Sequence, residues 1–253
     1  MSTAVMEHSA GSAARSEGTS PVARARLAGG LYAIYVAGCM FAQPIVHGML
    51  VVPGNAAATA ERIATRGALF QFAMATELFA VICFVAAALL LYGLLRPVNR
   101  GLALLALLAA VAESAIQCVS LLIQFVPSIL LGAGNAVLPA DQLQALAYGS
   151  FGIGGYGFNI YLVLFGVWFV ATGQLVLRSG FLPRFLGVLL WVAGLCCLID
   201  GFVCLFVPSM VGTTIIYLLA PFGLARFVLA GWLIAVGVNA REWRKMASLR
   251  GEN

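Results

Sequence analysis

Long apolar runs separated by short polar stretches dominate the chain. Six of these runs reach about 20 residues or more, the length that an α-helix needs to cross a hydrocarbon core about 30 Å thick. They are Leu27–Val52, Ala68–Leu95, Leu102–Leu131, Tyr156–Leu177, Phe185–Val207 and Thr214–Val238. The pattern therefore predicts an all-α, polytopic membrane protein in which six transmembrane helices form one bundle.

The stretches between the runs are rich in polar and turn-forming residues, which is typical of loops. They read PGNAAATAERIATRG, RPVNRG, GAGNAVLPADQLQALAYGSFGIGG, RSGFLPR and PSMVGT. Two of these loops are expected to hold short helices, because Asn55 can cap a turn that begins at Ala56 and Pro139 suits a first helical position ahead of Asp141. The domain prediction is a disordered cytoplasmic tail at 1–22, the transmembrane domain at 23–239 and a basic cytoplasmic tail at 240–253.

Composition supports a membrane protein and argues against a soluble globular domain and a nucleic-acid-binding protein. Hydrophobic residues make up 62% of the chain and charged residues only 9%, whereas soluble domains are about 45–50% apolar. The net charge is +5, but the basic residues occur in ones and twos between apolar runs, so nucleic acid is not an expected partner. The six cysteines all fall inside apolar runs and indicate no disulfide framework. The lipid bilayer is therefore the expected partner of the apolar runs.

The distribution of basic residues predicts the orientation of the chain. Eleven of them fall in the amino-terminal tail, the second and fourth loops and the carboxyl-terminal tail, whereas the first loop has only Arg62 and Arg66. Because basic residues concentrate on the cytoplasmic side, both termini are predicted to be cytoplasmic. The eleven are Arg15, Arg24, Arg26, Arg96, Arg100, Arg178, Arg184, Arg241, Arg244, Lys245 and Arg250.

Four stretches also resemble a known family. VVPGNAAATAERI, LYGLLRPVNRGLALLA, LPADQLQALA and SGFLPRFLGVLL are together similar to the bacterial membrane-protein family known as domain of unknown function 4386. The resemblance runs from about Ala23 to Asn239 and leaves out the polar amino-terminal tail. It implies the six-helix fold and a location in the inner (plasma) membrane of a bacterium, and it supplies no catalytic residue and no cofactor.

Small residues recur every seven positions in three of the predicted helices. Such stripes let helix backbones approach closely in a membrane, where lipid removes the ordinary hydrophobic force between helices. The alternative is that glycine is simply common in membrane helices. The stripes are Gly152, Asn159, Gly166 and Gly173 in the fourth helix, Gly187, Gly194 and Gly201 in the fifth, and Gly223, Ala230 and Gly237 in the sixth.

Charged and polar residues inside the spans are the candidate functional residues, because a charge near the bilayer centre costs several kcal/mol unless it is paired or hydrated. At a rise of about 1.5 Å per residue, Arg226 and Glu113 lie at one level, and we predict a buried ion pair between them. A second level lies further from the cytoplasm and is predicted to line an outward-facing polar cavity. Its members are Gln43, His47, Glu77, Gln117, Asn159 and Asp200.

The spans hold more acids than bases, which is the sharpest functional hint in the sequence. The spans contain three acids, Glu77, Glu113 and Asp200, and one base, Arg226. At least one acid therefore needs a proton, a bound cation, water or a hydrogen-bond donor. On the third helix, the spacing of Glu113, Gln117, Ser120 and Gln124 puts all four on one face, which is expected to look inward. A small molecule, a lipid or a cation is therefore a candidate ligand.

No enzymatic chemistry is indicated by the residues available. His47 is the one histidine inside a span and Lys245, the one lysine, lies in the tail, so no bis-histidine haem, retinal Schiff base or His-Glu-x-x-His zinc site is expected. We expect neither a metal nor a cofactor. Two readings remain open, a binding or transport protein with an intramembrane polar cavity, and a non-catalytic structural or partner-binding membrane subunit.

Overall fold

The computed structural model describes residues 20–130, 139–207 and 215–249. This part of the chain is helical and contains no strand. Its elements are α2 (Pro21–Gln43), the π-helical segment η2 (Pro44–Leu50), α3 (Ala56–Thr65), α4 (Gly67–Leu95), α5 (Arg100–Leu130), α6 (Ala140–Ser179), α7 (Arg184–Phe206), α8 (Ile215–Ala235) and α9 (Ala240–Leu249).

The length and apolarity of the helices confirm a polytopic membrane bundle. Five helical stretches of the described chain are long and apolar enough to cross a membrane: α2 with η2, α4, α5, α6 and α7. The carboxyl-terminal pair α8 and α9, which is bent by 95°, raises the count to six when it is taken as one span. The predicted six spans are thus the upper count.

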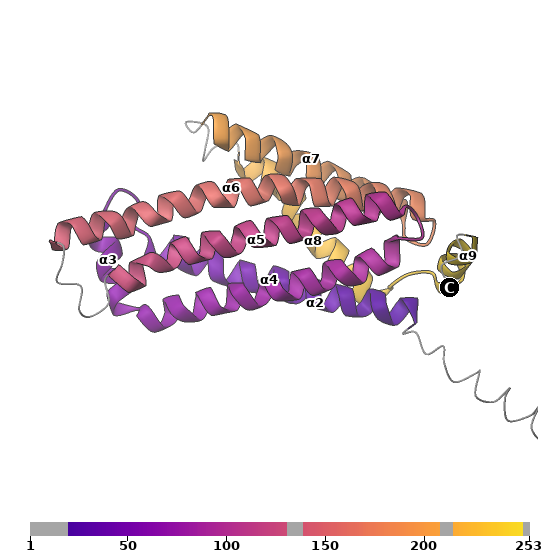
Figure 1. Cartoon of the computed structure of the whole chain (residues 1–253), viewed down its shortest axis with the longest axis horizontal. Helices are drawn as coiled ribbons and strands as arrows, with labels where there is room; N and C mark the ends of the chain where they lie inside the picture. The colour runs from indigo at the N-terminus through magenta and orange to yellow at the C-terminus, as the bar shows by residue number, and fades with distance from the viewer. Residues whose placement is uncertain (1–19, 131–138, 208–214, 250–253) are drawn as a thin grey trace, which may run out of the picture.

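The long helices lie side by side and alternate in direction (Figure 1). Helix α6 packs against α5 and α7, whereas α2 packs against α4 and α8. Figure 1 places α3 at one end of this bundle and α9 at the other, where the connections from α4 to α5 and from α6 to α7 also lie. The loops predicted to share one side of the membrane therefore share one end of the bundle.

Helix α6 is much longer than the sequence pattern indicated. Most of the predicted third loop is helical, because α6 starts at Ala140 and runs without a break for 40 residues to Ser179. At about 1.5 Å per residue it is about 60 Å long, twice the thickness of a hydrocarbon core. One glycine of this stretch serves packing: a Cβ at Gly154 would lie 2.8 Å from Cγ of Gln124 on α5. Just beyond the stretch, a Cβ at Gly157 would clash with Ser120.

The predicted helix starts are confirmed in one case and shifted by one residue in the other. Asn55 caps α3, and its side-chain oxygen accepts a hydrogen bond from the backbone N–H of Ala58 at 2.9 Å. Pro139 directly precedes α6 instead of opening it. Helix α2 already begins at Pro21, and residues 1–19 of the predicted tail lie outside the described residues.

Part of the predicted carboxyl-terminal tail forms helix α9. The side chain of Asn239 accepts hydrogen bonds from the backbone N–H groups of Arg241 at 3.1 Å and Glu242 at 3.4 Å, which caps the helix. The indole Nε1 of Trp243 donates to the carbonyl of Leu94, in the last turn of α4, at 2.8 Å. These contacts fix α9 against the end of the bundle.

The glycine stripes of the fourth and fifth predicted helices face each other between α6 and α7. A Cβ at Gly166 would lie 2.8 Å from the carbonyl oxygen of Gly194, and one at Gly173 would lie 2.8 Å from that of Gly187. The reciprocal distances from Gly194 and Gly187 are 2.8 and 3.0 Å. Real Cβ atoms do not come this close to backbone, so the two helices meet at a distance that only glycine allows.

The stripe of the predicted sixth helix has no such role. A Cβ at Gly223 would meet nothing within 4 Å among the described residues, and Gly237 has a positive φ of 73° after the end of α8. Helix α2 makes close contacts through two glycines that belong to none of the predicted stripes. A Cβ at Gly29 would lie 2.7 Å from Cβ of Leu233 on α8, and a Cβ at Gly38 would lie 2.7 Å from Cβ of Ala80 on α4. Seven-residue spacing alone therefore did not identify every interface.

Four exposed positions can test the predicted orientation. In a protein whose six native cysteines are replaced, cysteines at Ala57 and Gln142 are expected to react with a membrane-impermeant thiol reagent added outside the cell. Cysteines at Gly101 and Ser248, at the opposite end of the bundle, are expected to react only after permeabilisation. Reaction at Gly101 in intact cells would reverse the orientation.

Candidate functional site

A buried carboxylate on α4 joins three helices inside the bundle. The side chain of Glu77 is 1% exposed. Its Oε1 accepts a hydrogen bond from Nε2 of Gln43, at the end of α2, at 2.6 Å and another from Nε2 of Gln117 on α5 at 3.0 Å. The structure thus brings together three of the residues predicted to line the polar cavity.

The local backbone of the first span helps to place Gln43. Pro44 follows it and has no N–H to donate, so the regular α-helical hydrogen bonding is interrupted there. The chain continues as the π-helical segment η2, and the backbone N–H of Val51 donates to the carbonyl of Val46, five residues earlier, at 3.2 Å. Segments of this kind are frequent at functional sites.

Arg226 on α8 is held among aromatic rings. The guanidinium carbon lies 4.9 Å from the ring centroids of Tyr35 and Phe222 and 5.7 Å from that of Phe165. Positive charge is attracted to the face of an aromatic ring, more strongly where water is excluded. This surrounding was not predicted, although the four-residue spacing of Phe222 and Arg226, which puts them on one helix face, was a signal in the sequence.

Glu113 and Arg226 lie in the same buried region, but no hydrogen bond joins them in the described structure. Glu113 is fully buried and interacts electrostatically with Arg226. Its Oε1 has a long contact of 3.5 Å with the hydroxyl of Ser114, which donates to the carbonyl of Ala110 at 2.7 Å. The predicted ion pair therefore stays a prediction.

The inward polar face predicted for the third span is present on α5. The four residues of this face are all buried in the bundle: Glu113, Gln117, Ser120 and Gln124. Gln117 also reaches the thiol of Cys39 on α2, with 3.9 Å between Nε2 and Sγ. The spacing of four, three and four residues therefore identified the buried side of this helix correctly.

Several buried polar atoms in this region have no hydrogen-bond partner within the described protein. They are the hydroxyl of Tyr32, Oε2 of Glu77, Oε2 of Glu113, Oε1 of Gln117, Oε1 of Gln124, and Nε and Nη2 of Arg226. A buried polar atom without a partner costs about 1–3 kcal/mol, and native proteins contain few of them. We call the residues that carry these atoms, together with Gln43, the central polar cluster.

The other predicted cavity residues are not joined to Glu77 by hydrogen bonds in the described structure. Asp200 is buried in α7, with 2% exposure. Asn159 is half-buried on α6, and its backbone carbonyl oxygen lies against α7, 3.1 Å from the position of a Cβ at Gly201. His47 belongs to η2, and its side chain lies outside the described part of the structure.

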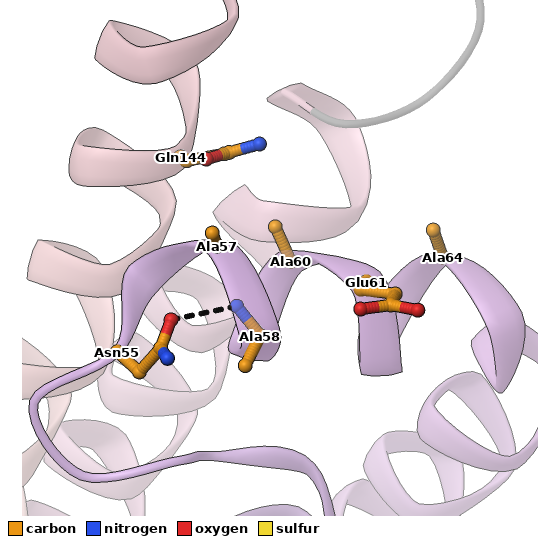
Figure 2. Close-up of a pocket in the computed structure, with 7 residues that line it drawn as sticks. All are labelled: Asn55, Ala57, Ala58, Ala60, Glu61, Ala64 and Gln144. Carbon is orange, nitrogen blue, oxygen red and sulfur yellow. Dashed lines mark hydrogen bonds between the residues drawn. The ribbon is translucent and has the colours of Figure 1, made fainter.

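Two open grooves lie apart from the central polar cluster. One, of about 600 Å³, lies at the end of the bundle that carries α3; Figure 2 shows alanine side chains of this helix facing Gln144 of α6. Asn55, Ala57, Ala58, Ala60, Glu61, Ala64 and Gln144 line it. The other, of about 630 Å³, lies between α4 and α5 and is mostly apolar. The residues that line these two grooves include none of the charged residues of the spans.

Metal-binding groups are not gathered in the region that the structure describes. No three His, Cys, Asp or Glu side chains there are placed to hold a metal ion. The chemistry of the cluster is that of hydrogen bonding and charge: carboxylate and amide oxygens that can accept, and a guanidinium and a hydroxyl that can donate. Such a site is suited to binding a polar molecule.

Comparison with known proteins identifies the family of the chain. No curated protein and no solved structure matches it. The family model described as Domain of unknown function (DUF4386) matches residues 27–237, which covers nearly all of the helical bundle. The chain, a multi-pass membrane protein, therefore belongs to the DUF4386 family.

Proposed function

We propose that this protein binds a small polar molecule within the membrane at the central polar cluster, as a binding or transport protein of the bacterial inner membrane. The observation that carries the proposal is the set of seven buried polar atoms that lack a partner in the described protein. Inside a bilayer no bulk water is present to satisfy such atoms. A bound molecule with complementary groups would satisfy those that lie near Arg226 and Glu113.

Much of the packing of the bundle is made by residues outside the central polar cluster. Glycine contacts join α6 to α7, and an aromatic core fills the space between α2, α4 and α6. Replacing buried ionic groups with apolar residues of similar volume is often neutral or stabilising. Polar side chains that contribute little to packing are more readily explained by contact with a ligand than by stability.

We further propose that the cluster is reached from the end of the bundle that carries α3, which is the outer side of the membrane. On α5 the buried polar face continues from Glu113 through Gln117 to Gln124, in the direction of that end. Gln43, also on this path, is only half-buried. A polar face that leads from the centre of a bundle to one end is typical of a ligand pathway.

Thiol reactivity from outside tests this function. In a cysteine-free protein, a Gln43→Cys variant is expected to react with a small hydrophilic thiol reagent added to the outer side, because Gln43 lies on the proposed pathway, which opens to water at that end. The matched control is Ala87→Cys on α4, where the parent side chain is fully buried and apolar; it should stay unreactive.

The second reading, a structural membrane subunit, predicts another outcome for the same experiment. It is favoured by the hydrogen bonds of Glu77, which connect α2, α4 and α5. If the cluster only holds these helices together, the interior is dry and the Gln43→Cys variant is as unreactive as Ala87→Cys. That result would replace the binding function with the structural one.

A further inference from the structure

The donors of Arg226 that lack a partner are the two that lie along one edge of its guanidinium group. The guanidinium carbon lies over the rings of Tyr35 and Phe222, whereas Nε and Nη2 make no hydrogen bond in the described protein. The hydroxyl of Tyr32 lies close to the guanidinium group and is also without a hydrogen bond. Arg226 is 9% exposed, so this edge is shielded from solvent. Two parallel N–H donors of arginine match the two oxygens of a carboxylate.

The described acidic residues do not occupy this edge. Glu113 is close enough to interact electrostatically with Arg226, yet its Oε2 is also without a partner. Glu77 accepts hydrogen bonds from Gln43 and Gln117 at Oε1, and its Oε2 is likewise without a partner. A pair of unsatisfied donors and an unsatisfied acceptor are therefore buried in one region.

Charge decides which kind of ligand satisfies both the donors of Arg226 and the acceptor of Glu113. An anion would meet the donors of Arg226 but would bring a second negative charge beside Glu113. A cation would meet Glu113 but would leave the donors of Arg226 without an acceptor. A molecule with one group of each sign meets both, and it adds no net charge to the buried region. The rings of Tyr35 and Phe222 suit an apolar body.

We propose that the ligand is a small zwitterion whose carboxylate binds Nε and Nη2 of Arg226 and whose ammonium group donates to Oε2 of Glu113. The proposal rests on the proposed function, because it names the ligand class of the same cluster. It assigns an amino-acid-like molecule with an apolar side chain to this site. The two charged ends and the apolar body each have a counterpart in named side chains.

Three probes with the same isobutyl body test the assignment on the purified full-length protein. Leucine has both charged groups, 4-methylpentanoate lacks the ammonium group, and leucinamide lacks the carboxylate. We expect leucine to raise the melting temperature and to bind, and each of the other two to bind at least about tenfold more weakly, because each loses one charged hydrogen-bonding group. Calorimetric titration measures the three affinities.

Two variants assign the charged ends to residues. In Glu113→Gln, 4-methylpentanoate is expected to bind as well as leucine, because the partner of the ammonium group has lost its charge. In Arg226→Gln, leucinamide is expected to match leucine. Glu61→Gln on α3 and Arg244→Gln on α9 remove exposed charges of the same types and should leave the order of the probes unchanged.

The affinities of the parent protein decide the proposal even if a variant does not fold. Equal binding of leucine and 4-methylpentanoate would identify a simple anion site, and equal binding of leucine and leucinamide a simple cation site; both results would overturn the zwitterion. Binding of none of the three would also overturn it. If the Gln43→Cys variant still reacts from outside, the proposed function survives that failure.

Discussion

A variant with alanine at both Gly166 and Gly173 is expected to lose about 1–3 kcal/mol of stability at each position, the usual cost of overfilling a packed interface. The atoms that the new methyl groups would meet first are the carbonyl oxygens of Gly194 and Gly187, at 2.8 Å in both cases. Backbone atoms cannot rotate away as a side chain can. Helices α6 and α7 would therefore have to move apart along the whole contact.

The control for this variant is the same chemical change at two glycines outside any close contact. A Cβ at Gly93 on α4 or at Gly231 on α8 meets nothing within 4 Å in the described structure. There, alanine should be neutral or stabilising because it forms helix better than glycine. Equilibrium unfolding in mixed micelles compares the two double variants. Equal stability of both would show that the glycine contact does not hold α6 to α7.

Removing the charge of Arg226 alone is expected to destabilise the protein by about 3–5 kcal/mol, because Glu113 would remain in the bundle without its opposite charge. Glu113→Leu should have a comparable effect by leaving the guanidinium uncompensated. The double variant Glu113→Leu/Arg226→Met is expected to recover much of the loss, since it removes both buried charges. This result would establish the predicted ion pair as an energetic interaction.

A double-mutant cycle measures the coupling between the two residues. Its control is a second cycle that combines Arg226→Met with Glu61→Leu, where the acid is exposed on α3 at the end of the bundle. Distant residues without shared partners have additive effects. If the Glu113 cycle is as additive as the Glu61 cycle, the two buried charges act independently and the ion pair is ruled out.

The sequence predicted the spans better than the loops, because apolar runs are a more direct signal than glycine. Apolar runs report directly on the length of chain that lipid can surround, so α4 and α7 were placed within two residues of their observed starts. Glycine is ambiguous: it permits a turn but also permits close packing. In the stretch before Tyr156 the glycines stand inside a helix, where Gly154 packs against α5, and α6 begins 16 residues before the predicted fourth span.

The candidate site was predictable along each helix but not between helices. Periodicity identified the buried face of α5, and the heights of Gln43, Glu77 and Gln117 placed them at one level, where the structure joins them. Neighbouring helices and their rotations are set by packing over the whole bundle, which no local pattern contains. For this reason the aromatic surroundings of Arg226 could not be anticipated, nor could the missing hydrogen bond between Arg226 and Glu113.

The contact between Trp243 and the end of α4 has a practical consequence for handling the protein. The indole satisfies one of the carbonyl groups that the last turn of a helix leaves unpaired. Shortening the chain at Asn239 to obtain a smaller protein for crystallisation would remove this partner and expose the carbonyl of Leu94. An affinity tag is better attached beyond Leu249, where α9 ends and the side chain is already 80% exposed.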